Sequence, residues 1–169
     1  LEQLPRHSSK RVSRSLQPND AHAAATLARE YLQLARMQSD PRYLGYAQAV
    51  LAPWARQENP PTEIQVLRAT AAQSLHQFDA ALRDLDAVLQ REPRHAQARL
   101  TRATVYQARG ELATARADCL HLEGNVSAVI ARTCVATVDA LTGNAARSYT
   151  VVAALREQLR IDDQAMATW

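Results

Sequence analysis

The 169-residue sequence is poor in the residues that build turn-rich or aromatic-rich proteins, with four glycines, seven prolines and 5% aromatic residues. So few turn residues argue against a β protein, and the strand-like alternation of β-branched and aromatic residues is missing throughout. The apolar fraction is nevertheless 47%, and alanine makes up the difference. Because small side chains suit helices that pack closely, we predict that the whole chain is helical.

Long apolar runs and lysines are also scarce. No stretch approaches the roughly 20 apolar residues of a membrane span, so we expect a soluble domain without one. Lys10 is the only lysine, and arginines are interleaved with acidic residues to give a net charge of +3. A nucleic-acid module usually gathers its basic residues in one stripe, so nucleic acid is an unlikely partner on this composition. The one basic cluster, Arg6, Lys10, Arg11 and Arg14, reads as a solvated leader, with weak contact to an anionic surface as the alternative.

Motifs for nucleophilic catalysis, phosphate binding and metal binding are missing. No G-x-S-x-G motif occurs, and glycines at positions 45, 110, 124 and 143 cannot form a phosphate loop. Histidines at positions 7, 22, 76, 95 and 121 are never three or four apart, so no helix presents two of them to a metal ion. We therefore predict that the protein is not an enzyme and uses no cofactor and no metal.

Apolar spacing and turn residues divide the chain into helices. Ser39, the pair Pro60-Pro61, Pro93 and the glycines mark helix ends, while Asp40 and the capping-box pair of Thr62 and Gln65 mark helix starts. The pattern predicts helices over about 20–38, 41–57, 62–75, 78–92, 95–109, 112–122, 127–141 and 145–160. Residues 1–18 read as a loosely ordered basic leader, 19–161 as the helical domain, and 162–169 as the start of a truncated or capping helix.

An internal repeat of 34 residues runs through the middle of the chain. It pairs Ala69 with Ala103 and Ala81 with Ala115, and it aligns Phe78 with Leu112. Two helices in each period of 34 residues resemble the tetratricopeptide-repeat family, in particular its bacterial members. The resemblance implies an all-α solenoid, a superhelix of about four helix hairpins over units 20–57, 62–95, 96–124 and 127–160.

The family places small residues at the helix crossing, a turn residue between the helices and a closing proline. The residues of this chain that match those roles are Ala69, Phe78, Ala81, Pro93, Ala103, Tyr106, Gly110, Ala115 and Gly143. A small residue at the crossing lets two helices pack 8–10 Å apart, so we expect Ala69 and Ala81 to face each other inside their hairpin.

Charged residues recur with the same period. Arg68 precedes Asp84 by sixteen residues, and Arg102 precedes Asp118 by sixteen. The corresponding positions of the outer units are apolar, so the charges occur and disappear together. We predict a partly buried structural ion pair in each middle hairpin, since a single buried charge is costly.

The two cysteines lie on the helices on either side of Gly124. Cys119 is five residues before this glycine and Cys134 ten after it, which offsets them by about 7 Å along axes that are ~9 Å apart. This separation exceeds a disulfide, so we predict two free, buried thiols. The compartment stays open between the cytoplasm and export to the periplasm, because a sequence that begins at Leu1 leaves a removed leader possible.

The resemblance also implies a binding surface, because the first helix of each unit lines a concave groove in this family. The matching positions here are Glu63, Val66, Thr70, Gln73, Gln97, Leu100, Thr104, Gln107, Ile130, Thr133 and Thr137. Its threonines, glutamines and aliphatic residues could hold a peptide or a helix of a partner protein. The groove lacks the basic residues of the chaperone-binding subgroup, so chaperone docking is not expected.

We therefore predict a scaffold for protein–protein interaction. One alternative is an assembly role, in which exposed ends stack copies into a homo-oligomer or join neighbouring domains of a longer chain. The other is helical-repeat RNA binding, which would depend strongly on salt. For the groove itself, plain solvated surface is the competing interpretation.

Overall fold

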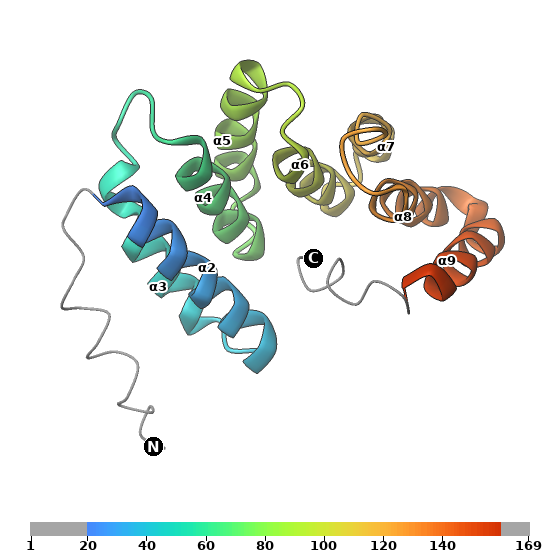
Figure 1. Cartoon of the computed structure of the whole chain (residues 1–169), viewed down its shortest axis with the longest axis horizontal. Coiled ribbons are helices and arrows are strands. Elements are labelled where there is room, and N and C mark those ends of the chain that lie inside the picture. The colour runs from blue at the N-terminus through green and yellow to red at the C-terminus, as the bar shows by residue number, and fades with distance from the viewer. Residues whose placement is uncertain (1–19, 160–169) are drawn as a thin grey trace. The chain divides into compact units, whose positions relative to one another are not determined.

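The computed structural model of the chain describes residues 20–159, and all the regular secondary structure of this part is helical (Figure 1). The all-α fold class is therefore confirmed for these residues. The helices are α2 (Ala21–Gln38), α3 (Arg42–Leu51), the short η1 (Ala52–Trp54), α4 (Thr62–Ser74), α5 (Phe78–Arg91), α6 (Ala96–Ala108), α7 (Leu112–Leu120), α8 (Ala128–Asp139), η2 (Ala140–Asn144) and α9 (Ala145–Leu159). The predicted leader, 1–18, and the predicted helix start at 162–169 lie outside the described residues.

The chain divides into two compact units, with the boundary inside α5. Unit 1 ends at Asp84 and unit 2 begins at Leu85. Within the described residues no helix combines the length and the apolar character needed to cross a membrane.

Unit 1 is built on the pairing of α2 with α3, and both helices also contact α4 (Figure 1). Its core is rich in alanine: Ala25, Ala28, Ala47 and Ala71 have no exposed surface. Such small side chains let helix backbones approach closely, and the larger Trp54 packs into the same core from η1. The apolar side chains at helical spacing along α3 and η1 are all buried: Leu44, Ala47, Leu51 and Trp54.

Helix ends in unit 1 follow the sequence signals in some places and depart from them in others. Asp20 caps α2 by accepting a hydrogen bond from the backbone N–H of Ala23 at 3.0 Å, and Ser39 ends the helix with a φ of 52°. The N-cap of α3 is Pro41, one position after the predicted Asp40, but the Asp40 carboxylate accepts a hydrogen bond from the Arg42 N–H at 3.0 Å at the start of the helix.

The predicted N-cap at Thr62 is also displaced by one position. Pro61 is the N-cap of α4 and makes no side-chain cap bond, so Thr62 is already the first helical residue. Gln65 is buried, and its amide donates to the carboxylate of Asp84 over 3.4 Å. A buried amide needs a partner inside the protein, and Asp84 provides one for Gln65.

In unit 2 each helix packs against the next one along the chain: α6 on α7, α7 on α8, and α8 on α9. His95 caps α6 through its ring Nδ1, which accepts from the Ala98 N–H, and Ser127 caps α8 through its hydroxyl. Gly110 and Gly143 have φ angles of 77° and 92°, a left-handed conformation that favours glycine. These glycines end their helices where the sequence pattern predicted.

The four alanines of the 34-residue repeat are all interior. Ala69, Ala81, Ala103 and Ala115 have no exposed surface. Within unit 2, Ala103 on α6 and Ala115 on α7 belong to one core cluster. A larger side chain at these positions would have no space, as the repeat register requires.

The prediction of two free thiols is wrong, because Cys119 and Cys134 form a disulfide with a Cα–Cα distance of 5.4 Å. The distance between two helix axes is larger than the distance between residues on their facing sides. Cα atoms lie about 2.3 Å from their axis, so residues on facing sides are much closer than the axes are. In addition, α7 ends at Leu120 and α8 begins at Ala128, so the segment between them does not advance along a helix axis as the count from Gly124 assumed.

Candidate functional site

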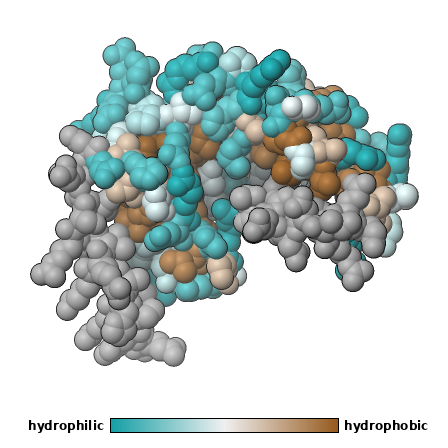
Figure 2. All heavy atoms as spheres, in the orientation of Figure 1, coloured by the Kyte–Doolittle hydropathy of each residue, from teal (hydrophilic) through white to brown (hydrophobic). Residues whose placement is uncertain are grey.

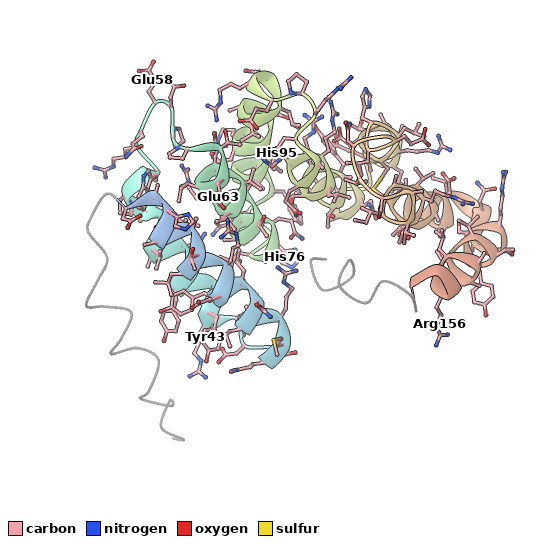
Figure 3. The ribbon with its side chains drawn as sticks, viewed as in Figure 1. Tyr43, Glu58, Glu63, His76, His95 and Arg156 are labelled. Atoms are coloured by element: carbon pink, nitrogen blue, oxygen red, sulfur yellow. A yellow bond between two sulfur atoms is a disulfide. The ribbon has the colours of Figure 1, made fainter. Side chains whose placement is uncertain are left out.

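The predicted groove positions on α4 offer little free surface. Val66 is only 5% exposed, so the prediction that it contacts a partner is not supported by its position. Glu63, labelled in Figure 3, is exposed and forms an ion pair with Arg29 of α2. Thr70 is half-buried and donates its hydroxyl to the Val66 carbonyl at 2.9 Å, while Gln73 is half-buried. In α4 the repeat pattern therefore marks positions that mostly serve contacts inside unit 1.

The predicted positions on α6 are more accessible. Gln97 and Thr104 are exposed, and Leu100 and Gln107 are half-buried. The Thr104 hydroxyl donates to the Leu100 carbonyl at 3.0 Å, so it can only accept a bond from a ligand. This face of α6 carries no charge at the four positions.

The predicted positions on α8 are also uncharged residues. Thr137 is exposed, Ile130 and Thr133 are half-buried, and the Thr137 hydroxyl donates to the Thr133 carbonyl at 2.9 Å. Figure 2 shows hydrophobic surface over α6 and α8 interspersed with polar groups. We call the predicted positions on these two helices the α6–α8 face: Gln97, Leu100, Thr104, Gln107, Ile130, Thr133 and Thr137.

A network of charged side chains in unit 2 is centred on the buried Asp118. Arg102 donates from Nε and Nη2 to the Asp118 carboxylate at 2.7 Å each, and Arg99 donates to the same carboxylate at 2.9 Å. Arg102 also donates to Asp86 of α5 at 2.7 Å. The hydrogen bond to Asp118 is the main reason why the pKa of Arg102 is raised, so Arg102 itself stays charged at any ordinary pH.

The matching pair in unit 1 is looser. Arg68 lies 3.4 Å from the Asp84 carboxylate and also donates to the Trp54 carbonyl at 3.2 Å. Burial raises the pKa of Asp84 more than Arg68 and Gln65 lower it. Both ion pairs that the sixteen-residue spacing predicts are therefore present, but their surroundings differ.

A pocket of about 240 Å³ opens beside the unit 1 pair. Its lining residues come from α3, η1 and the turn after it, α4, and the segment from Gln77 into α5: Gln48, Leu51, Ala52, Ala55, Arg68, Ala72, Gln77, Ala80 and Asp84. The Gln48 amide donates to the Gln77 side-chain oxygen at 3.0 Å. The pocket therefore combines short apolar walls with a cation, a carboxylate and two carboxamides.

Three tyrosines form an aromatic cluster at one end of the α2–α3 hairpin, where Figure 3 labels Tyr43. The ring centroids of Tyr31, Tyr43 and Tyr46 lie 5.6 to 6.2 Å apart. Burial is the main cause of the raised pKa of Tyr31. The sequence reasoning missed this cluster, although the spacing of Tyr43 and Tyr46 by three residues on one helix was a usable signal.

No family model, curated protein or solved structure that was compared with the chain matches it. Within residues 20–159, no three histidine, cysteine, aspartate or glutamate side chains are grouped closely enough to hold a metal ion. The uncharged α6–α8 face and the unit 1 pocket are the two candidate sites that the geometry offers.

Proposed function

We propose that the protein is a non-enzymatic scaffold for protein–protein interaction, a solenoid of the tetratricopeptide-repeat kind as found in bacteria. The observation that carries this proposal is the accessible, uncharged α6–α8 face of unit 2. The burial of the paired alanines supports the hairpin register on which the resemblance depends. The expected ligand is an extended segment or a helix of another protein.

The chemistry of the face suits a polypeptide. Thr104 and Thr137 use their hydroxyl protons within their own helices, so they accept bonds from backbone or side-chain N–H groups. Gln107 can donate and accept, and the half-buried Leu100 and Ile130 provide apolar contact. Without a charge at these positions, binding is expected to depend only weakly on salt.

A position-specific crosslink tests this proposal. A photoreactive amino acid placed at Thr137 should capture a distinct protein from native lysate, because this exposed position belongs to the α6–α8 face. The matched control is the same amino acid at Thr114, an exposed position on α7. Thr104→Arg should abolish the Thr137 adduct, since it places a charge on the face without disturbing a buried side chain.

Two results would contradict the scaffold assignment for this face. Equal capture at Thr114 and Thr137 would show contact without specificity. A Thr137 adduct that survives Thr104→Arg unchanged would show that the captured protein does not occupy the face.

Assembly into a homo-oligomer is a second candidate, favoured by exposed apolar side chains along η2 and α9. Tyr149 is 77% exposed, and Leu141 and Val152 are also exposed. Large exposed apolar residues are enriched where proteins associate. Sedimentation at increasing concentration should reveal self-association that Tyr149→Ser weakens; a monomer at every concentration would exclude this candidate.

The disulfide favours export over the cytoplasm for this chain. Disulfides form and persist in oxidising compartments, and the two cysteines of unit 2 are joined and buried. Thiol alkylation of the native protein followed by mass measurement tests this location. Full alkylation of both cysteines without prior reduction would contradict it.

A further inference from the structure

Residues around the pocket in unit 1 can be compared with the residues 34 positions later in the chain, most of which belong to unit 2. The offset relates Leu51 to Leu85 and Ala47 to Ala81, and all four side chains have no exposed surface, which supports the register. The same offset relates the charged network of unit 2 to the pocket residues of unit 1. The equivalent pairs are Ala52 and Asp86, Ala55 and Leu89, Gln65 and Arg99, Arg68 and Arg102, Ala72 and Tyr106, and Asp84 and Asp118.

Three of these pairs show why the pocket is open. Arg102 has the Asp86 carboxylate at 2.7 Å and lies 5.9 Å from the ring centre of Tyr106. The residues equivalent to Asp86 and Tyr106 are Ala52 and Ala72, and both line the pocket. At a third position of the pocket lining, Ala55, the side chain is again shorter than its equivalent in unit 2, which is Leu89. The pocket therefore occupies space that side chains of the protein fill in the next repeat.

Because Ala52 and Ala72 stand where unit 2 has Asp86 and Tyr106, Arg68 has fewer partners than Arg102. Among the described residues, Asp84 is the only carboxylate that pairs with Arg68, and the closest approach is 3.4 Å. The side chains of Arg68 and Asp84 are 23% and 16% exposed, so a group that enters the pocket can reach both.

The charge balance of the pocket determines which group fits. In unit 2, two arginines balance two aspartates, whereas in unit 1 Gln65 replaces one arginine and Ala52 replaces one aspartate. A carboxylate entering the pocket would face Asp84 without the second arginine, and an ammonium group would face Arg68. An uncharged group with one acceptor and one donor avoids both repulsions.

A carboxamide has this combination. Its oxygen can accept from Arg68 while its NH₂ donates to Asp84. The Gln48 and Gln77 side chains are bonded to each other at 3.0 Å, and their remaining oxygen and NH₂ group offer a second acceptor and donor in the lining. The alanine walls leave room for the methylene groups that carry the amide.

We propose that the unit 1 pocket binds the carboxamide side chain of an asparagine or glutamine in a partner polypeptide. That the carboxamide comes from a partner polypeptide rests on the proposed scaffold function. That the pocket binds a carboxamide does not depend on it. The pocket holds a side-chain group rather than a large ligand, because about 240 Å³ is below the usual range of small-molecule sites.

Three isosteric probes test the chemistry directly. Propionamide, propionate and propylammonium differ in charge but hardly in size, and binding can be followed through the NMR signals of the Gln48 and Gln77 side-chain NH₂ groups and the Arg68 Nε–H. Propionamide should give saturable shifts with a Kd on the order of 10 mM, as expected of so small a ligand. The two charged probes should bind at least about tenfold more weakly.

Variants that copy unit 2 provide the controls. Ala55→Leu fills the pocket, and Ala52→Asp supplies the carboxylate that Arg102 receives from Asp86; both alanines are exposed, so the fold should be kept. Each variant should abolish saturable binding of propionamide. Ala49→Leu, at an exposed position of α3 outside the pocket lining, should leave the binding unchanged.

The competing outcomes are distinct. Propionate binding as tightly as propionamide would make the pocket an anion site and overturn the proposal. Shifts that never saturate, or that persist in Ala55→Leu, would overturn the assignment of the pocket as a binding site. Failure of the Thr137 crosslink with intact propionamide binding would count against the scaffold function alone, since that crosslink tests unit 2.

Discussion

Arg102 and Asp118 are joined by two parallel hydrogen bonds of 2.7 Å between α6 and α7. The Asp118 side chain is only 3% exposed, so the guanidinium groups of Arg102 and Arg99 take the place of the water that the carboxylate loses on folding. Paired planar groups of this kind make strong, directional contacts. The pair therefore fixes how α6 and α7 pack against each other.

Loss of Arg102 should be strongly destabilising. Arg102→Ala leaves Asp118 buried with only Arg99 as a cation, and removing one partner of a buried pair costs about 3–5 kcal/mol. Urea unfolding measures the change in the free energy of unfolding. Arg116→Ala is the matched control, because the Arg116–Asp139 pair is exposed and its loss should have little effect. Equal losses in both variants would refute a special contribution from Arg102.

Enlarging the repeat alanines should also destabilise the fold. Ala81→Leu and Ala115→Leu each place extra volume at a position with no exposed surface, which should cost about 1–3 kcal/mol through overpacking. Thermal melting measures the loss. Ala113→Leu on the same helix as Ala115 is exposed and should melt like the wild type. If all three variants melted alike, the buried alanines would not set the helix packing.

Most of the local structure could be predicted from the sequence because it depends on neighbouring residues. The helix ends at Gly110 and Gly143 follow from a residue type that tolerates a positive φ. The ion pairs Arg68–Asp84 and Arg102–Asp118 could be predicted because two positions changed together in a repeat.

The features that the sequence missed depend on three-dimensional detail. The disulfide depends on which sides of α7 and α8 face each other, and residue counts from a turn do not contain this information. Val66 is on the predicted face of α4 but is buried, which the periodic pattern alone cannot distinguish. The pocket arises from the absence of side-chain volume at Ala52, Ala55 and Ala72, and it becomes visible only when the units are compared.

Reduction of the disulfide should loosen unit 2. The bond closes a loop with a sequence separation of 15, for which chain entropy predicts a stabilisation of about 3 kcal/mol. Urea unfolding with and without a strong reductant should therefore show a loss of this size. The variant Cys119→Ala with Cys134→Ala should not respond to the reductant. A wild type that is equally insensitive would show that the bond is absent in solution.

The pKa values of Asp84 and Asp40 are shifted in opposite directions, so their contributions to the free energy of unfolding should change with pH in opposite directions. Burial raises the folded-state pKa of Asp84 above its ordinary value of 3.8, so its contribution is fully present below about 3.8 and is lost as the pH rises through the folded pKa. Hydrogen bonds from Arg42 lower the pKa of Asp40, so its contribution is present above 3.8 and is lost as the pH falls through the folded pKa. Unfolding of the wild type, Asp84→Asn and Asp40→Asn at about pH 2.5 and about pH 7 compares the two, because the contribution of Asp40 is lost only below its ordinary pKa of 3.8. Relative to its asparagine variant, the wild type should gain stability on acidification at Asp84 and lose it at Asp40. A loss at both positions would mean that Arg68 outweighs the burial of Asp84.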